Sequence, residues 1–444
     1  MPLATNTQRD SVRKLQRTLY LSAKEDPRRR FHALHDKIYR RDVLEEAWVA
    51  VRANRGTCGI DGVTIGDIEL RGTEKFLRRL SEDLRSGTYR PQPGKRVWIP
   101  KPGRAEKRPL SIPTVRDRVV QAALKIVIEP VFEPDFLPCS HGFRPRRSTH
   151  DALQVLVDET FNGRRWVVET DIASCFDDIP HAGLLAAVAE RICDGGVLHL
   201  VRMMLASGVM EHGVRRNGTT GTPQGGVVSP LLANIYLHKL DVWWSQNGQG
   251  RLCRYADDLV VLCRSEKEAL QALSDLRSVL GSLGLGLKES KTRQIYLEEG
   301  GPGFDFLGFH HRWVRARGAR HVTFLARWPS RTALQRARDR MRDLTKRSHL
   351  ARTTEDVIRS LTRFLQGWAA YFRYGNSARC FDTIRRYAVQ RLCSFVGKRH
   401  KGSTRLGWYL AVYRDRLNKQ LVDLSGMVRA PRPNRPWRIS ESRG

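Results

Sequence analysis

The sequence predicts an α+β fold, and three observations lead to that prediction. Short apolar segments flank the pair Asp257-Asp258, the pattern of a β-hairpin with acidic residues at its turn. A second apolar segment, residues 167–172, reads as a short buried strand that ends at Asp171. After Trp328 the chain changes to arginine-rich stretches whose apolar residues have helical spacing. We therefore expect antiparallel strands that carry acidic side chains, followed by basic helices.

Composition indicates the size of the fold and the kind of partner. A chain of 444 residues is long enough for about two or three domains. Lysine and arginine total 78 against 46 acidic residues, a net charge of +32, and residues 311–444 contribute +24 of it. Charge so one-sided indicates a polyanionic partner, and nucleic acid is favoured over membrane because no long apolar or amphipathic anchor accompanies the charge.

Cysteines and targeting signals add further limits. The 8 cysteines contain no Cys-x-x-Cys pair, so neither a zinc module nor a disulfide framework is indicated. The N-terminus has no apolar leader, and no segment approaches transmembrane length. We therefore expect a cytoplasmic protein.

Taken in order, the first ninety residues predict a basic N-terminal arm over 1–30, mobile or a short helix, and an extension over 31–90. Residues 31–39 and 43–51 of the extension have helical spacing.

After the extension, residues 95–101 alternate as in a strand, and residues 103–107 turn the chain back into residues 108–113, which predicts a basic hairpin. Amphipathic helices are expected over 115–124, 231–240, 266–283, 332–348, 354–371, 381–396 and 408–421, and a strand and turn over 304–309.

The acidic residues are the candidate chemical site. Two adjacent carboxylates in a turn are usually solvated, and otherwise they are neutralised by a divalent cation. Asp171 at the end of another strand supplies the third acid, and hard oxygen ligands from two separate strands suit two-metal phosphoryl transfer. The alternative is that Asp171 caps the helix that follows it.

Three motifs carry a resemblance to a known family. They are Thr170-Asp171 with Phe176-Asp177, residues 221–237, and residues 254–258, which read Arg-Tyr-Ala-Asp-Asp. Together they resemble reverse transcriptases, and more narrowly the group II intron-encoded reverse transcriptases, or intron maturases, of bacteria. The resemblance runs from about Phe31 to about Leu410, and the wording of residues 229–234 points to the intron lineage rather than to retroviral enzymes.

The resemblance implies a right-hand polymerase fold. Fingers and a palm with an antiparallel sheet would span residues 91–310, an α-helical thumb and maturase domain residues 311–425, and a Pro/Arg-rich tail residues 426–444. Many relatives continue into a His-Asn-His endonuclease. This chain has no cysteine after Cys393 and a single histidine, His400, after His349, so we expect the type that lacks an endonuclease domain.

The resemblance also implies roles for residues near the acids. Asp171, Asp257, Asp258 and the main chain of Ile172 would bind two Mg²⁺ ions, for which Mn²⁺ can substitute. Further roles are implied for residues that would contact the nucleotide: Lys101 and Arg108 on its phosphates with Arg96 behind them, Ile172 and Gln224 in its pocket, and Phe176 as the steric gate that excludes a 2′-hydroxyl. Without the family context, the basic hairpin could equally be a solvated edge strand and Phe176 a core residue.

Other residues have weaker assignments. Lys291 would protonate the departing pyrophosphate, or else is an exposed lysine without a role; Lys288 nearby stands where the family usually has asparagine. Arg144 and Arg147 would meet phosphates, and each could equally form a structural ion pair. Gly308 lies in a segment resembling the primer grip, and Trp368 and Arg373 lie in an aromatic and arginine stretch that would grip nucleic acid, unless the helices form a bundle with a solvated exterior.

The implied function is RNA-templated DNA synthesis together with assistance to intron splicing. The expected partners are group II intron RNA, an RNA template with a DNA primer, dNTPs and target DNA, with no membrane and with association to the nucleoid. The oligomeric state, monomer or dimer, stays open. Alternatives are a related reverse transcriptase used in CRISPR or phage defence, and an RNA-binding splicing factor without polymerase use; Phe176 disfavours an RNA-making polymerase.

Overall fold

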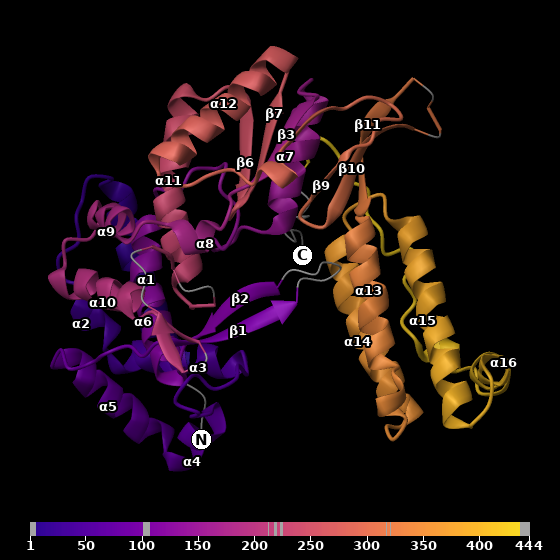
Figure 1. The fold of residues 1–444 in the computed structure, drawn as a ribbon, viewed down its shortest axis with the longest axis horizontal. Coiled ribbons are helices and arrows are strands. Elements are labelled where there is room, and N and C mark those ends of the chain that lie inside the picture. Colours follow the sequence, from indigo (N-terminus) through magenta and orange to yellow (C-terminus); the bar gives the residue numbers. More distant parts are fainter. Residues whose placement is uncertain are drawn as a thin grey trace. The chain divides into compact units, whose positions relative to one another are not determined.

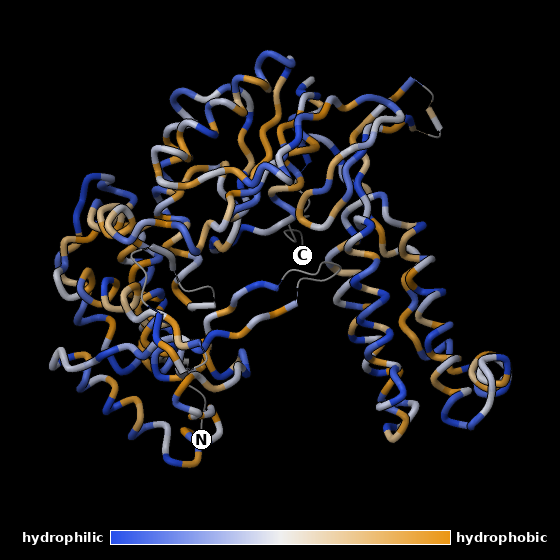
Figure 2. Tube along the Cα trace, viewed as in Figure 1, coloured by the Kyte–Doolittle hydropathy of each residue, from blue (hydrophilic) through white to orange (hydrophobic). Residues whose placement is uncertain are grey.

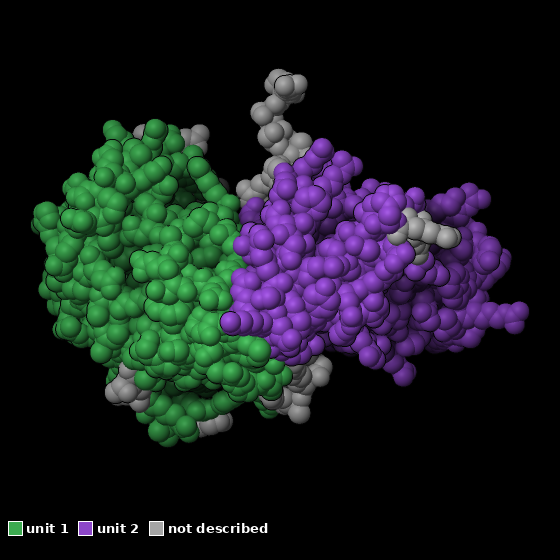
Figure 3. Space-filling view, turned by 90° about the horizontal axis from the view of Figure 1, so that it is seen from above, with its two compact units in different colours: residues 1–148, 170–261, 270–292 green, residues 149–169, 262–269, 293–444 purple. Residues whose placement is uncertain are grey.

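The computed structural model forms two compact units that interleave along the chain, shown in different colours in Figure 3. Unit 1 comprises residues 1–148, 170–261 and 270–292, and unit 2 comprises residues 149–169, 262–269 and 293–444. The structure describes residues 6–100, 107–211, 213–216, 220–222, 225–316, 318–319 and 321–435. Because these units are defined by contacts, they cut the chain differently from the five sequence segments, whose boundaries stay a prediction.

The chain combines runs of helices with mainly antiparallel strands, as in an α+β fold (Figure 1). Up to residue 148 the elements are α1 (Asn6–Glu25), α2 (His35–Ile38), α3 (Arg41–Ala53), α4 (Ile65–Arg71), α5 (Thr73–Arg85), β1 (Gly94–Pro100), β2 (Lys107–Ile112) and α6 (Val115–Phe132). The next are α7 (Thr149–Phe161), β3 (Trp166–Asp171), α8 (Cys175–Asp178), α9 (His181–Ala189), α10 (Gly195–Ala206), β4 (Val209–Glu211), β5 (Val214–Arg216), α11 (Ser229–Asn247), β6 (Arg251–Tyr255), β7 (Asp258–Cys263), α12 (Glu266–Ser282) and the 3₁₀ turn η1 (Glu289–Lys291). The remainder are β8 (Arg293–Tyr296), β9 (Phe304–Phe306), β10 (Phe309–Arg315), β11 (Thr323–Pro329), α13 (Arg331–Leu344), η2 (Arg347–His349), α14 (Thr354–Phe372), α15 (Ala378–Arg399), α16 (Thr404–Trp408), η3 (Tyr409–Arg414) and η4 (Leu417–Gln420).

The N-terminal segment is a 20-residue helix, longer than the arm or short helix expected from its polar composition. Helix α1 contacts α6 and α3, and it buries Val12, Leu19 and Ala23. The expected helix over 43–51 is present as α3, whereas 31–39 yields only the single turn α2. The reason is that Phe31 is extended, since its N–H donates to the Arg191 carbonyl at 2.8 Å.

The described strands form three sheets, and two of them lie wholly or partly in unit 1. The predicted basic hairpin is confirmed as β1 and β2, in antiparallel register from Lys95 opposite Ile112 to Pro100 opposite Lys107, and β4 joins β1 in parallel. The sheet of order β6-β7-β3-β8 contains the predicted acidic hairpin. Its strand β7 is a hydrophobic stretch after Asp258 (Figure 2), and residues 259–263 are fully buried, which anchors the turn at the strand's start.

Unit 2 combines the sheet β11-β10-β9 with the C-terminal helices. Helices α13, α14 and α15 confirm three predicted helices, and α14 and α15 bury the apolar side of each helix. The helix predicted over 408–421 is wrong: α16 ends at Trp408, and the segment then forms a π-helical turn (η3) and a 3₁₀ turn (η4), which are separated at Arg416 with φ +50°. None of the helices that the structure describes is both long and apolar enough to cross a membrane.

Candidate active site

Backbone hydrogen bonds bring the predicted acidic residues to one place in unit 1. Asp171 is the last residue of β3, and the N–H of the next residue, Ile172, donates to the Asp257 carbonyl at 3.0 Å. On the other side, Lys288 N–H donates to the Asp171 carbonyl at 2.8 Å. The end of β3 therefore lies between the acidic turn and the segment that leads to Lys291.

The turn between β6 and β7 consists of Ala256 and Asp257, and Asp258 is the first residue of β7. Ala256 has φ +57°, a left-handed conformation that non-glycine residues seldom adopt. Burial raises the pKa of Asp257, and the positive charges of Arg108 and Lys288 partly oppose that rise. Two positive side chains from different segments thus act on one carboxylate of the turn.

The carboxylate of Asp171 is paired with a predicted site residue. Lys291 Nζ donates to Asp171 Oδ2, and both side chains are partly accessible to solvent. The hydroxyls of the neighbouring residues Thr170 and Thr292 lie 2.8 Å apart, which ties the end of β3 to the segment after η1. Sequence placed Lys291 near the acids, and the structure brings it there.

Oxygen is the ligand that this arrangement offers to a metal. The end of β3 offers the Asp171 carboxylate and the Ile172 carbonyl, and the neighbouring turn offers the Asp257 carboxylate. Such oxygen ligands suit a hard divalent cation. Side chains alone do not complete such a site: within the described residues, no group of three or more His, Cys, Asp or Glu residues is placed to hold a metal ion. The donor set fits a metal that takes further oxygen ligands from substrate phosphates or water.

The predicted nucleotide contacts have mixed outcomes. Arg108 is exposed on β2 and acts electrostatically on Asp257. Arg96 is half-buried on β1. Phe176 lies in α8, half-buried, and its carbonyl accepts from Thr222 N–H at 2.6 Å. Lys101 and Gln224 lie outside the described residues.

For the two arginines predicted to meet phosphates, the structure separates the alternatives. Arg144 is only 8% exposed, pairs with Glu133 at 2.8 Å, and donates to the carbonyls of Leu137 and Ser140, both at 2.8 Å. These bonds support the structural ion pair and leave little of the guanidinium for a phosphate. Arg147 is exposed, so its predicted contact stays a prediction.

The predicted nucleic-acid contacts of unit 2 also differ from one another. Gly308 has φ +79° in the turn between β9 and β10, where its carbonyl accepts from Ser330 N–H at 2.9 Å. Trp368 is 8% exposed, and its ring packs on Phe372 and Phe381, so it is part of the helical core rather than an open stacking surface. Arg373 is half-buried and lies over the ring of Tyr374 at 4.7 Å.

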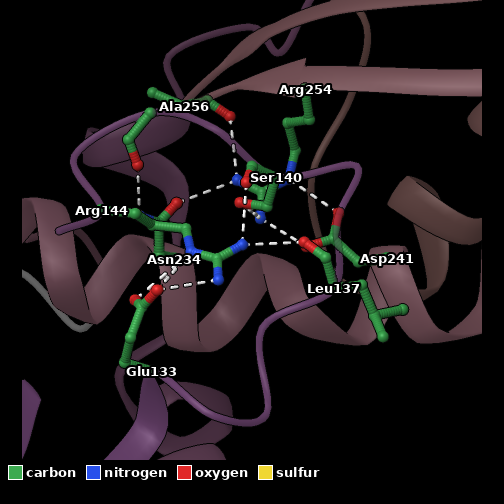
Figure 4. Close-up of polar contacts among 9 residues, drawn as sticks. Glu133, Leu137, Ser140, Arg144, Asn234, Asp241, Arg254 and Ala256 are labelled. Atoms are coloured by element: carbon green, nitrogen blue, oxygen red, sulfur yellow. Dashed lines mark hydrogen bonds and ion pairs between the residues drawn. The ribbon is translucent and has the colours of Figure 1, made fainter. Parts of the chain in front are cut away.

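Sequence reasoning gave no role to the residue that makes the densest contacts at the site. Arg254 begins the Arg-Tyr-Ala-Asp-Asp motif, is completely buried, and is bonded to Asp241, Asn234 and Ser140 (Figure 4). The available signal was an arginine directly after the apolar pair Leu252-Cys253 in a predicted strand, since charged side chains are seldom buried unless they are paired.

Comparisons with known proteins agree with this site. Residues 99–311 match the family described as reverse transcriptase (RNA-dependent DNA polymerase), and residues 334–413 match the group II intron maturase-specific domain. Protein YkfC of Escherichia coli K12 is 36% identical over 346 residues, covering 69% of this chain and 89% of YkfC. The group II intron-encoded protein LtrA of Lactococcus lactis subsp. cremoris is 40% identical over 213 residues, covering 48% of this chain and 35% of LtrA.

This chain thus spans most of YkfC but only about a third of the length of LtrA. The two matched domains follow one another in a single chain, and the reverse transcriptase match includes all three acidic residues. The chain belongs to the group II intron-encoded reverse transcriptases, RNA-directed DNA polymerases whose polymerase domain is followed by a maturase domain.

Proposed function

We propose that this chain copies RNA into DNA at the site formed by Asp171, Asp257 and Asp258. The observation that carries the proposal is the Ile172–Asp257 backbone hydrogen bond, which holds two acidic strand ends side by side. The reaction is the attack of a primer 3′-hydroxyl on the α-phosphate of a dNTP, with loss of pyrophosphate. Reverse transcriptases depend on divalent metal ions, and we propose two Mg²⁺ ions, with Mn²⁺ as a substitute.

Each residue then has a defined task. Asp171, Asp257, Asp258 and the Ile172 carbonyl would hold the metal ions, which would supply activation of the hydroxyl and neutralisation of the leaving oxygen. The positive charge of Arg108 partly opposes the burial that raises the pKa of Asp257, and we propose that Arg108 also neutralises the triphosphate, together with Arg96 and Lys101. Lys291, whose ammonium lies at Asp171, would donate the proton that the departing pyrophosphate takes up.

We propose that the same chain assists the splicing of a group II intron, as its maturase-specific match suggests. Residues 311–444 carry 32 basic and 8 acidic residues, which suits binding to structured intron RNA, to the primer–template duplex and to target DNA. The exposed Arg147 and the turn at Gly308 are further candidate contacts. We propose that the protein acts in the cytoplasm, and at the nucleoid when it is bound to nucleic acid.

The direct test is primer extension on an RNA template with Mg²⁺ and either dNTPs or rNTPs, at two salt concentrations. We expect DNA product from dNTPs and a lower yield at higher salt, because binding to phosphates releases counterions. Absence of DNA product, together with tight binding to structured RNA, would overturn the polymerase proposal and favour a splicing factor alone.

Replacement of Phe176 by alanine tests the proposed sugar selectivity. Phe176 lies five residues after Asp171, and truncating its ring would remove the steric barrier to a 2′-hydroxyl. We expect the preference for dNTPs over rNTPs to fall by about 10- to 200-fold. Single-nucleotide incorporation with each nucleotide type gives the ratio.

Phe161→Ala is the matched control, because it truncates the same kind of side chain at a position on α7 that is 64% exposed. Its selectivity should equal that of the unmodified protein. An unchanged ratio in Phe176→Ala, with polymerisation intact, would remove the gate assignment.

A further inference from the structure

Arg254 uses every hydrogen-bond donor that an arginine has. Its guanidinium carries five N–H groups, and five bonds are made inside a completely buried site (Figure 4). Nε and Nη2 donate to the Asp241 carboxylate at 2.8 and 2.5 Å, Nη1 donates to Asn234 Oδ1 at 3.0 Å and to the Ala256 carbonyl at 3.2 Å, and Nη2 donates to Ser140 Oγ at 2.8 Å. No donor is left for a ligand, so the role of Arg254 is internal.

The acceptors come from three different segments of unit 1. Asp241 and Asn234 lie on α11, Ser140 lies in the loop after α6, and Ala256 is in the acidic turn itself. The Asn234 amide extends the network, because Nδ2 donates to the Gly142 carbonyl at 2.8 Å. One guanidinium therefore ties the turn to a helix and to a loop at the same time.

The loop is also paired directly with β6. Arg254 N–H donates to the Cys139 carbonyl at 2.8 Å, and His141 N–H donates to the Arg254 carbonyl at 2.9 Å. The main chain of Arg254 thus bonds to Cys139 and His141, and its side chain bonds to Ser140 between them. Both sets of bonds fix the position of the end of β6 against this loop. The two residues that follow Arg254 lead straight into Asp257.

The conformation of the turn explains why it requires such support. Ala256 is held at φ +57°, a left-handed conformation that disfavours a residue with a Cβ and persists only where surrounding structure determines it. Arg254 Nη1 binds the carbonyl of this residue, just before the Asp257 amide. That bond fixes the orientation of the peptide group that precedes the candidate metal ligand.

Stability alone does not account for the pair. Arg254 and Asp241 are both 0% exposed, and a buried ion pair of this kind is often replaceable by apolar residues of similar volume without loss of stability. Apolar residues cannot reproduce the directed bonds to Ala256 and Asn234. The property that only Arg254 supplies here is geometric.

We propose that Arg254 is a positioning residue for the polymerase reaction, and that with Asp241 and Asn234 it holds the Ala256-Asp257 turn in the conformation that sets Asp257 beside the end of β3. The rate measurements that test this inference rest on the proposed function. The metal-binding measurement tests the inference even if the protein makes no DNA. Arg254 itself contacts neither substrate nor metal.

The test compares stability, rate and metal binding in two sets of variants. The double variant Arg254→Met/Asp241→Leu removes both buried charges together, which avoids leaving one of them without a partner. Arg254→Lys keeps the charge but cannot form the five-donor fork. The matched control is Arg41→Met/Glu74→Leu, which removes a solvent-exposed ion pair of 3.0 Å in the same unit.

We expect the double variant to stay folded, although the buried acceptors of Asn234 and Ala256 lose their donor, and to lose about 100-fold in kcat with KM for dNTP within about twofold. Mn²⁺ binding, measured by titration calorimetry without nucleotides, should weaken by about 10- to 100-fold. Arg254→Lys should fold and lose rate in the same direction. The exposed control pair should leave rate and Mn²⁺ binding unchanged.

The proposal is overturned if the double variant folds with the rate and Mn²⁺ affinity of the unmodified protein, since the pair would then be merely structural. If the double variant does not fold, Arg254→Lys decides by the same two readouts; failure of both to fold would also overturn it, because Arg254 would serve the whole unit rather than the turn. If the unmodified protein makes no DNA, the proposed function fails, and Mn²⁺ affinity alone decides this inference.

Discussion

Asp257→Asn is expected to abolish DNA synthesis while the protein stays folded. The substitution replaces a carboxylate oxygen that would bind metal with a neutral amide, at nearly constant volume. Losing metal-based charge stabilisation of several kcal/mol corresponds to a fall in rate of about 1,000-fold or more. Single-turnover extension of a DNA primer on an RNA template measures the rate directly, and a rate within tenfold of the unmodified protein would exclude Asp257 as a metal ligand.

The same substitution should make the protein more stable at neutral pH. Burial raises the pKa of Asp257 in the folded state above its value in the unfolded chain. The folded state therefore binds the proton more tightly than the unfolded chain does. The protonated Asp257 carboxyl contributes fully to the free energy of unfolding below the unfolded pKa, and this contribution is lost as pH rises through the folded pKa. Asparagine cannot ionise and escapes that loss, so Asp257→Asn should melt at a higher temperature near pH 7 and at an equal temperature in acid.

Asp275→Asn is the matched control for both readouts, since Asp275 lies on α12 and accepts a hydrogen bond from Gln271 at 2.8 Å, a bond that asparagine can keep. Its rate and melting temperature should change little. Intron RNA binding should be unaffected by Asp257→Asn, because the excess positive charge lies in residues 311–444. Loss of RNA binding in a folded Asp257→Asn protein would contradict separate polymerase and maturase roles.

The parts of this site that could be predicted from sequence depend on local pattern. Two short apolar segments on either side of the acidic pair predicted the β6–β7 hairpin, and an apolar run ending in an acid predicted β3. Helices α3, α12 and α14 followed from regular apolar spacing in the same way. Each of these elements is stabilised by burying a regular pattern of its own apolar side chains. A short stretch of sequence is therefore enough to predict whether it forms a strand or a helix.

The parts that could not be predicted depend on distant partners. Arg144 and Arg254 look alike in sequence as arginines within motifs, but their partners Glu133 and Asp241 lie on helices α6 and α11 or just beyond them. Trp368 lies in an arginine-rich stretch typical of nucleic-acid contacts, yet its ring fills a gap between α14 and α15. Composition indicates that a region is basic, but only the packed structure shows which of its side chains are buried or bonded within the protein.

Gly142→Ala is expected to disable the polymerase through a single methyl group. A Cβ at Gly142 would lie 2.5 Å from the Ala256 nitrogen and 3.0 Å from the Tyr255 carbonyl carbon, both main-chain atoms of the acidic turn. Main chain cannot rotate away as a flexible side chain can, so the turn itself must shift. We expect a fall in kcat of about 100-fold, from misplacement of Asp257, and a loss of about 1–3 kcal/mol in the free energy of unfolding.

Gly281→Ala makes the same chemical change where there is room for it. Gly281 is the penultimate residue of α12, and outside the backbone of its own helix no atom lies within 4 Å of an added Cβ, so alanine should preserve the rate and add up to about 1 kcal/mol of stability. A Gly142→Ala protein with an unchanged rate would mean that the turn tolerates displacement.

Because Gly142 and Arg254 constrain the same turn, combining Gly142→Ala with Arg254→Lys tests whether they act through one element. Residues that act through a shared structure give non-additive effects in a double-mutant cycle, whereas independent sites add. Once the alanine methyl group has displaced the Ala256-Asp257 turn, removing the guanidinium fork should displace that turn little further. We therefore expect the combined loss of rate to be smaller than the product of the two separate losses, and a multiplicative loss would show that Gly142 and Arg254 support catalysis by separate routes.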